Sequence, residues 1–243
     1  MAVLLVMTAC VGTSIISSCS SDEDNQLAEL NKISFNVSGT TDGHEYVDLG
    51  LPSGTLWAMC NVGANSPEQY GDYFAWGETS SKSEYNWTTC FDTEDNGATF
   101  NKYNNIDITT GLQPKDEAAP KLLPEDDAAT ANWGSNWQMP SYAQIVELCD
   151  NNNTTTIWTT HNGVNGRLIK SKKNENCIFL PAPGYRYYTG LYIAGNIAYY
   201  WSRSLDVSNS VNAYYLSFGS GTVGCGCDVR CYGRSVRPVR SQE

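Results

Sequence analysis

Three cysteines near the end of the chain, Cys225, Cys227 and Cys231, could take part in redox chemistry or bind a metal. Thiolates attack disulfides and serve as zinc ligands. The Cys-x-Cys-x3-Cys spacing differs from the common zinc spacings, however. Two other cysteines, Cys10 and Cys19, lie near the N-terminus. The remaining seven are an odd number, so at least one is unpaired: Cys60, Cys90, Cys149, Cys177, Cys225, Cys227 and Cys231. We expect disulfides or buried thiols rather than metal ligands.

The chain has only two histidines, His44 and His161, and they are far apart in sequence. A Ser-His-Asp triad or a histidine-rich metal site would have to use one of them. Each lies near a turn, and we expect both to be exposed polar residues of loops. The acidic run at residues 125–127 could supply oxygen ligands to calcium, but carboxylates also favour the positive end of a helix dipole. We favour the helix start, and we expect no metal and no other cofactor.

Length and composition describe a single acidic globular domain. The chain has 243 residues, a formal net charge of −11 and a pI near 4.6. Charged residues make up 17% and aromatic residues 12%, so the chain is not disordered and can bury a core. Binding of nucleic acid depends on cationic contacts to phosphate, which an acidic balance disfavours. We therefore expect no nucleic-acid partner.

The terminal segment, residues 184–240, has an unusual set of side chains. It contains no Lys, Glu, Gln or Met and is rich in Tyr, Ser, Gly, Asn, Val and Cys. Tyr and Arg provide a large contact area at a modest loss of entropy, which favours a surface selected for contact. Paired strands also disfavour Glu and Lys, but strand formation does not explain the missing Gln and Met.

The terminal segment also holds all but one of the arginines of the chain and only two acidic residues, Asp206 and Asp228. Either these arginines form a locally basic face on an acidic body, or they pair with carboxylates inside the domain. The sequence leaves both interpretations open.

Residues 1–18 have the features of a secretory signal peptide. The apolar run at residues 2–16 is shorter than the ~20 residues of a membrane span and fits the apolar region of a leader. Small residues directly before Cys19 resemble the lipobox of bacterial lipoproteins, in which this cysteine becomes the lipidated first residue. The acidic run at residues 20–25 resembles the signal that directs lipoproteins to the outer face of the outer membrane. These resemblances imply a lipid anchor on Cys19, an outer-membrane location exposed at the cell surface, and a polar linker at residues 19–43.

Local patterns predict an α+β fold with two short helices and a mostly antiparallel twisted sheet with long loops. Helices are expected at residues 125–132 and 141–149, where Ser141 and Gln144 form a capping box. Residues 80–120 lack periodicity and are expected to form a long insertion. One short strand could form at residues 33–37 in the linker. The other expected strands are residues 45–49, 55–60, 157–160, 167–170, 177–181, 198–203, 213–218, 222–225 and 235–240.

Six segments, in this order, resemble the Fibrobacter-type major paralogous domain of bacterial surface lipoproteins. They are HEYVDLGLPSGTLWA (44–58), YGDYFAWGE (70–78), NWGSNWQMPS (132–141), FLPAPGYR (179–186), YYWSRS (199–204) and GRSVRPVR (233–240). That family is similar to the formylglycine-generating, sulfatase-modifying group, whose domain has a C-type lectin-like fold. The resemblance implies a C-type lectin-like domain at residues 44–243, with a ligand-display segment at residues 184–240.

The terminal segment also resembles the variable proteins of diversity-generating retroelements. In those systems, randomised adenines turn the asparagine codon AAC into any NNC codon. NNC codons do not encode Lys, Glu, Gln, Met or Trp, which matches the missing residue types. Trp201 is the one exception, and it lies in the matched segment 199–204. The resemblance implies that this segment displays side chains for binding, and active diversification is an open question.

The resemblance points to residues between the matched segments, together with Arg203 of the segment 199–204, as the contacts of a surface ligand. The sequence leaves open whether this partner is a protein, a glycan or a phage component. The expected ligand-binding residues are Tyr188, Tyr192, Ile193, Arg203, Leu205, Asp206, Ser217, Gly219, Cys225, Cys227 and Asp228. The tryptophans expected in or beside the core are Trp57, Trp76, Trp133, Trp137 and Trp201.

Two other functions are compatible with the sequence. In formylglycine-generating enzymes, two cysteines near the end of the domain bind copper and carry out an oxidation, so the resemblance admits a copper-dependent oxidase-like enzyme. Here Cys227 and Cys231 are separated by only three residues and lie directly against the terminal strand, whereas the family's pair is more widely spaced. This departure disfavours catalysis, and we expect a binding protein rather than an enzyme. A structural subunit of a surface assembly is the other alternative.

Overall fold

The computed structural model describes residues 35–93, 95–103, 121–206 and 208–241, which belong to one compact unit that begins at Phe35. The predicted leader, the predicted lipidation site Cys19 and most of the predicted linker lie outside the described residues. Within the described ranges, no helix is long and apolar enough to cross a membrane.

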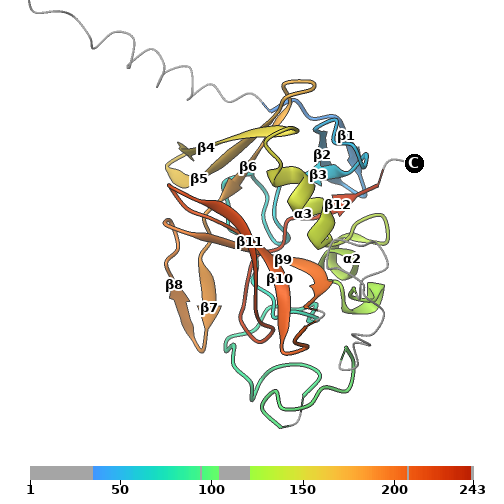
Figure 1. Ribbon diagram of the computed structural model, residues 1–243, viewed down its shortest axis with the longest axis vertical. Coiled ribbons are helices and arrows are strands. Elements are labelled where there is room, and N and C mark those ends of the chain that lie inside the picture. The colour runs from blue at the N-terminus through green and yellow to red at the C-terminus, as the bar shows by residue number, and fades with distance from the viewer. Residues whose placement is uncertain (1–34, 94, 104–120, 207, 242–243) are drawn as a thin grey trace, which may run out of the picture. The chain divides into compact units, whose positions relative to one another are not determined.

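The described residues form an α+β structure with two α-helices, one 3-10 helix and several antiparallel sheets (Figure 1). The α+β prediction is therefore confirmed. The helices are η2 (Pro124–Asp126), α2 (Ala128–Trp133) and α3 (Tyr142–Cys149). The strands are β1 (Gly39–Thr41), β2 (His44–Asp48), β3 (Leu56–Ala58), β4 (Thr154–His161), β5 (Val164–Ser171), β6 (Cys177–Pro181), β7 (Tyr185–Tyr187), β8 (Gly190–Tyr192), β9 (Ala198–Leu205), β10 (Asn212–Phe218), β11 (Val223–Val229) and β12 (Val239–Arg240).

The strands of the described part form four sheets, with the orders β1-β2-β3-β12, β4-β5-β6, β11-β10-β9 and β7-β8. The last strand returns to the first sheet, because Val239 of β12 pairs with Trp57 of β3. Helix α3 packs against β9, β10, β11 and β4. Figure 1 shows α3 between the β4-β5-β6 sheet and the β11-β10-β9 sheet. The helix thus joins the two sheets that follow it in the chain.

The terminal strand is shorter than predicted. Only Val239–Arg240 form a regular strand, whereas residues 235–240 were expected to do so. The residues before β12 bond to two different partners: the amide of Trp201 donates to the Ser235 carbonyl oxygen, and the amide of Val62 donates to the Val236 carbonyl oxygen. Because this segment crosses from one sheet to another, it does not pair continuously with either.

The folded unit begins earlier than the sequence suggests. Strand β1 lies within the predicted linker and pairs with β2, with Thr41 opposite His44. Asp42 and Gly43 connect the two strands with φ values of 50° and 82°. An Asp-Gly pair favours this backbone in two-residue hairpin turns, so the signal was present in the sequence. Residues 35–37 form no strand, contrary to the expectation for residues 33–37.

Both helices begin at predicted acidic or hydroxyl caps. The Asp127 carboxylate accepts hydrogen bonds from the amides of Ala129 and Thr130 at the start of α2. The Ser141 hydroxyl accepts from the Gln144 amide, and the Gln144 side chain accepts from the Ser141 amide, which completes the predicted capping box of α3. The acidic run at residues 125–127 is thus a helix start, as predicted.

Beside a small cluster of Tyr73, Ala75 and Tyr85, two large clusters of buried side chains form the core of the described part. One includes Trp57 of β3, Ile145 of α3 and Ile178 of β6, and the other includes Trp137 and Trp201. The five tryptophans predicted for the core are all buried, namely Trp57, Trp76, Trp133, Trp137 and Trp201. The core therefore recruits residues from nearly every part of the described chain.

Four of the six arginines of the terminal segment are buried and therefore do not form a basic face. Arg230, Arg234, Arg237 and Arg240 are only 2%, 1%, 1% and 8% exposed. The structure therefore favours the internal alternative, although the groups that surround these cations are mainly carbonyl oxygens and aromatic rings. Arg234 is the one whose partner is a carboxylate, that of Asp228, among the ion pairs between described residues.

Arg237 holds three separate segments together through hydrogen bonds. Its Nε donates to Oδ1 of Asn61 at 2.7 Å, and its Nη2 donates to the Phe179 carbonyl oxygen at 3.1 Å. Its Nη1 donates to the carbonyl oxygens of Ala58 at 3.0 Å and Met59 at 2.5 Å. Burial lowers the pKa of Arg237 from its usual high value. These acceptors replace the water that the guanidinium loses when it is buried.

Replacing Arg237 by Met should lower the free energy of unfolding by about 3 kcal/mol or more, because buried acceptors lose their donors. Arg237→Lys should recover only part of this loss, since an ammonium lacks the planar fork of donors. Urea denaturation followed by tryptophan fluorescence measures both. Lys173→Met at an exposed position is the control, with an expected change within about 0.5 kcal/mol. Equal effects of Arg237→Met and Lys173→Met would contradict the assigned role.

Candidate ligand-contact surface

The β7-β8 hairpin carries the most exposed aromatic side chains of the terminal segment. Tyr188 is 50% exposed, Tyr192 is 44% exposed and Ile193 is 41% exposed. All three belong to the predicted ligand-binding set. The hairpin leaves β6 at Gly184, where φ is 66° and a Cβ atom would lie 2.0 Å from the Tyr192 carbonyl oxygen. Only glycine allows this close return of the chain.

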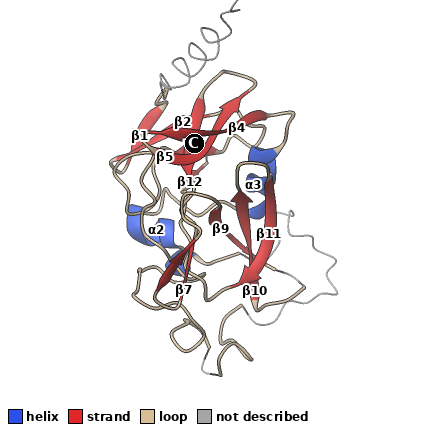
Figure 2. Cartoon of the chain, turned by 90° about the vertical axis from the view of Figure 1, so that its left-hand side faces the viewer, coloured by secondary structure: helices blue, strands red, loops and turns tan. Residues whose placement is uncertain are grey.

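Seven tyrosines form a continuous group that we call the tyrosine face. Tyr185 lies at the centre, with ring centroids 5.5 Å from Tyr192, 5.6 Å from Tyr199 and 5.5 Å from Tyr232. Figure 2, which views the side that carries β7, shows β9, β10 and β11 beside it. The members of the tyrosine face are Tyr185, Tyr187, Tyr188, Tyr192, Tyr199, Tyr215 and Tyr232.

A buried cation supports the tyrosine face from below. The Arg234 guanidinium lies 4.8 Å from the ring centroid of Tyr199, 4.2 Å from that of Trp201 and 4.0 Å from that of Tyr215. Its Nη2 donates to Oδ2 of Asp228 at 2.5 Å, so the half-buried carboxylate balances the charge. Burial lowers the pKa of Arg234. The rings are thereby held in place by a cation that does not reach the surface.

Three hydroxyls of the tyrosine face, those of Tyr187, Tyr215 and Tyr232, stay protonated at neutral pH. A hydrogen bond with Tyr188 raises the pKa of Tyr187, and burial raises the pKa of Tyr215 and of Tyr232. Each hydroxyl can therefore donate and accept a hydrogen bond. The tyrosine face offers ring faces for stacking and neutral polar groups for hydrogen bonds.

Tyr85, which is far from the β7-β8 hairpin in the sequence, fixes the tip of that hairpin. It is fully buried and forms a backbone bridge with Tyr188, with N–H to oxygen distances of 3.0 Å and 2.8 Å. Its hydroxyl donates to the Tyr73 carbonyl oxygen at 2.5 Å. Its ring lies close against Gly233, where a Cβ atom would come within 2.7 Å of the ring. Tyr85 thus connects the exposed hairpin to the buried part of the unit.

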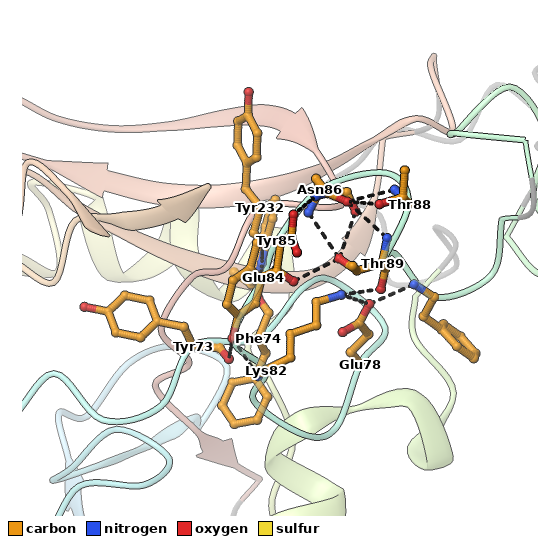
Figure 3. Close-up of polar contacts among 12 residues, drawn as sticks. Tyr73, Phe74, Glu78, Lys82, Glu84, Tyr85, Asn86, Thr88, Thr89 and Tyr232 are labelled. Carbon is orange, nitrogen blue, oxygen red and sulfur yellow. Dashed lines mark hydrogen bonds and ion pairs between the residues drawn. The ribbon is translucent and has the colours of Figure 1, made fainter. Parts of the chain in front are cut away.

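A network of polar contacts holds the loop that contains Tyr85 (Figure 3). Oε1 of Glu78 accepts from Nζ of Lys82 at 2.7 Å and from the Phe91 amide at 2.8 Å. Oδ1 of Asn86 accepts from the amides of Thr88 and Thr89 at 2.9 Å and 3.1 Å. The loop needs no regular secondary structure, because side chains satisfy its backbone groups.

Five of the predicted contact residues lie on or beside the tyrosine face. Tyr188, Tyr192 and Ile193 belong to the hairpin or follow it directly. Ser217 pairs with Tyr199 across β10 and β9, so its side chain shares the face of that tyrosine. Asp228 reaches the same face through its contact with Arg234.

The other six predicted contact residues lie away from the tyrosine face. For three of them the prediction is wrong, because they are buried. Cys225 and Cys227 pair with Leu216 and Tyr214, so they lie on the opposite face of the sheet from Tyr215, and Arg203 contacts the Gln138 side chain. Leu205 and Asp206 are 1% and 2% exposed, and Gly219 is buried as well. These three residues are not available to a ligand: Leu205, Asp206 and Gly219.

Asp206 is buried because it organises the turn between β9 and β10. Its Oδ1 accepts from the Ser208 amide at 2.9 Å and from the Ser208 hydroxyl at 2.7 Å. Burial alone would raise the pKa of Asp206, but the hydrogen bonds from Ser208, the Cys227 thiol and the Tyr214 hydroxyl outweigh burial and lower it. The carboxylate stabilises the turn rather than a ligand.

The cysteines and histidines that could take part in chemistry are dispersed. Cys227 is exposed and donates to Asp206, whereas Cys231 is buried near Cys90. Both histidines are packed in strands rather than exposed in loops, since His44 stacks on Trp133 at 3.6 Å and His161 lies 5.4 Å from Phe179. Among the residues that the structure describes, no three His, Cys, Asp or Glu side chains are placed to hold a metal.

Sequence reasoning missed Tyr185, Tyr199, Tyr215 and Tyr232 as members of the surface. A partial signal was present, because Tyr199 and Trp201 alternate in β9, so that both point to the face opposite Tyr200. Whether that face belongs to the surface depends on the neighbouring β7-β8 hairpin, and the sequence did not predict this hairpin.

Comparisons of this chain with protein-family models, with curated proteins and with solved structures find no match.

Replacing Gly233 by Ala should disturb the hairpin through Tyr85. The added methyl group would overlap a ring that has no room to move, and such overpacking costs about 1–3 kcal/mol. Hydrogen exchange measured by mass spectrometry should show faster exchange at residues 185–193. Gly221→Ala is the matched control, since a Cβ atom there meets nothing within 4 Å. Unchanged exchange at residues 185–193 in Gly233→Ala would show that Tyr85 does not support the hairpin.

Asp206→Asn should reduce stability at pH 6 by about 1 kcal/mol, with a difference that fades in acid. The folded pKa of Asp206 lies below the unfolded value, so its stabilising effect is present above the unfolded pKa near 3.9 and is lost as pH falls through the folded pKa. Urea midpoints measured from pH 2 to pH 7 provide the test. Ser208→Ala removes a donor and should move the loss to higher pH. A difference that grows as the pH falls would refute this assignment.

Proposed function

We propose that this chain is a cell-surface lipoprotein that binds a ligand through its tyrosine face. The observation that carries the proposal is the continuous group of seven tyrosines, four of which belong to the β7-β8 hairpin or its tip. Two of these four, Tyr188 and Tyr192, are exposed. Isolated exposed aromatics are common on proteins, whereas a contiguous exposed group marks an interaction site. Tyrosines are also favoured at recognition surfaces, because they bury a large area with only two rotatable angles.

The surroundings of the tyrosine face support recognition by a rigid surface. Tyr85 fixes the hairpin, and Arg234 fixes the rings of Tyr199 and Tyr215. Side chains that are already ordered lose little entropy when a ligand binds. The charge of Arg234 is balanced by Asp228, so the face favours a neutral ligand over a strongly charged one.

The same proposal includes the C-type lectin-like fold and the lipid anchor. Two short helices, antiparallel sheets and long loops are what the family resemblance implies for the fold. The segment before Cys19 and the acidic run after it support an anchor at the outer membrane, with the ligand-binding domain outside.

Diversification of the terminal segment by a retroelement is a further part of the proposal. The exposed residues Tyr188, Tyr192 and Ile193 are types that NNC codons encode, and Trp201, which they do not encode, is fully buried. A near-repeat of the terminal coding stretch beside a reverse-transcriptase gene is the expected genomic observation. Its absence would remove diversification from the proposal and would leave the binding surface unaffected.

The double variant Tyr188→Ala, Tyr192→Ala should weaken ligand binding about 30-fold, which corresponds to a loss of about 2 kcal/mol. Glycan arrays, peptide libraries and bacterial cell surfaces, probed with the full chain, provide candidate ligands. Ile157→Ala is the control, because Ile157 is 47% exposed on β4, away from the tyrosine face. Ligands that bind the double variant and the control equally well would contradict binding through this surface.

The alternative of a copper-dependent oxidase has a direct test as well. Cys227 and Cys231 differ in exposure and have different neighbours, which gives no support to a shared copper site. We expect no turnover of cysteine-containing peptides when the full chain is titrated with copper. Turnover that disappears in Cys227→Ala would establish the oxidase and overturn a function limited to binding.

A further inference from the structure

Two cysteines that lie far apart in sequence meet at the junction of α3 and β11. Cys149 is the last residue of α3, and Cys225 lies in β11. Both are half-buried and pack against the same core cluster. Cys225 pairs with Leu216 of β10, which is 2% exposed, so the thiol lies on the face of the sheet that α3 covers.

The two thiols contact each other directly. A hydrogen bond joins the Cys149 and Cys225 side chains. No second thiol–thiol hydrogen bond is found among the described cysteines, which are all in the reduced form. A disulfide requires sulfur atoms that can approach each other without movement of the backbone. Cys149 and Cys225 are therefore the pair best placed to meet this requirement.

The surroundings of the pair favour its oxidation. The hydrogen bond from Cys149 lowers the pKa of Cys225, and the same hydrogen bond together with burial raises the pKa of Cys149. Arg167, which is 6% exposed, places a positive charge near Cys149, and its Nε has no hydrogen-bond partner among the described residues. The thiolate is the reactive form in disulfide exchange, so Cys225 is the first thiol to attack, and Arg167 favours the later loss of the Cys149 proton.

We propose that Cys149 and Cys225 form a disulfide that joins the end of α3 to β11. This inference does not depend on the proposed ligand-binding function. The oxidant is an external disulfide, either of a small thiol or of a dithiol–disulfide oxidoreductase.

The reaction is a two-step exchange. The Cys225 thiolate attacks one sulfur of the external disulfide, whose S–S bond breaks and releases one thiolate. Cys149 then loses its proton to solvent, and its sulfur attacks the Cys225 sulfur and releases the second thiolate. The two released thiolates take up the two protons that the cysteines have lost. Two protein thiols are oxidised and one external disulfide is reduced to two thiols.

The bond would secure an otherwise weak position. Strand β11 pairs with β10 on one side and is the end strand of its sheet within the described residues. It also carries Asp228, which contacts Arg234 below the tyrosine face. The disulfide would close a loop of about 75 residues, and long closed loops give large stabilisation because they restrict the unfolded chain.

Oxidised glutathione added to the full chain provides the test, followed by alkylation in denaturant, trypsin digestion and mass spectrometry. Tryptic cleavage puts Cys149 in the peptide of residues 122–167 and Cys225 with Cys227 in the peptide of residues 204–230. We expect these two peptides to be joined in the wild type and in Cys227→Ser. We expect them to be separate in Cys149→Ser and in Cys225→Ser. Full alkylation of Cys149 and Cys225 after oxidation, or a link lost in Cys227→Ser but kept in Cys225→Ser, would overturn the proposal.

Thermal unfolding gives a second readout. Reduction of the oxidised wild type should lower Tm by about 5–15 °C. The Tm of Cys149→Ser should not respond to reduction, whereas that of Cys177→Ser, which loses a buried thiol outside the pair, should respond as the wild type does. A response that persists in Cys149→Ser would assign the effect to other cysteines and would contradict the proposed bond.

Discussion

The buried guanidinium of Arg237 requires hydrogen-bond acceptors inside the protein, and this requirement determines how the terminal chain packs on the rest of the unit. The guanidinium bonds to the Asn61 side chain and to the carbonyl oxygens of Ala58, Met59 and Phe179. These groups come from the first sheet, from the loop after it and from β6. Each of these segments has to be in place before the cation is satisfied. The terminal chain can therefore dock only on an assembled core, which makes closure of the first sheet by β12 a cooperative step.

The same constraint shapes the surface. Arg234 lies three residues before Arg237 and is buried as deeply, but rings and one carboxylate surround it instead of carbonyl oxygens. The planar guanidinium can stack on Tyr199, Trp201 and Tyr215 and still reach Asp228. Lysine could not do both, because its ammonium is a compact point charge. The absence of Lys from the terminal segment is thus partly a requirement of its interior.

The features that the sequence predicted well depend on local signals. The capping box of Ser141 and Gln144 places the start of α3 correctly, and β6 forms at the predicted residues. The missed features depend on contacts between distant residues. The partners of Arg237 are more than 50 residues away from it in sequence, so no local pattern indicates its burial. The β7-β8 hairpin depends likewise on Tyr85, which lies about 100 residues before Tyr188.

The composition of the terminal segment mixes two causes that only the structure separates. Lys, Glu and Gln are avoided at buried positions as well as at contact positions. Their absence therefore does not distinguish a buried position such as Leu205 from an exposed one such as Tyr188. Leu205 is 1% exposed and Tyr188 is 50% exposed. The proposed contact residues Tyr188 and Tyr192 differ from Leu205 because their large aromatic side chains remain accessible to solvent. Tyrosine meets this description because its hydroxyl tolerates water while its ring packs on a neighbour. The tyrosine face is therefore stronger support for the proposed recognition than the absence of Lys, Glu, Gln and Met from the terminal segment.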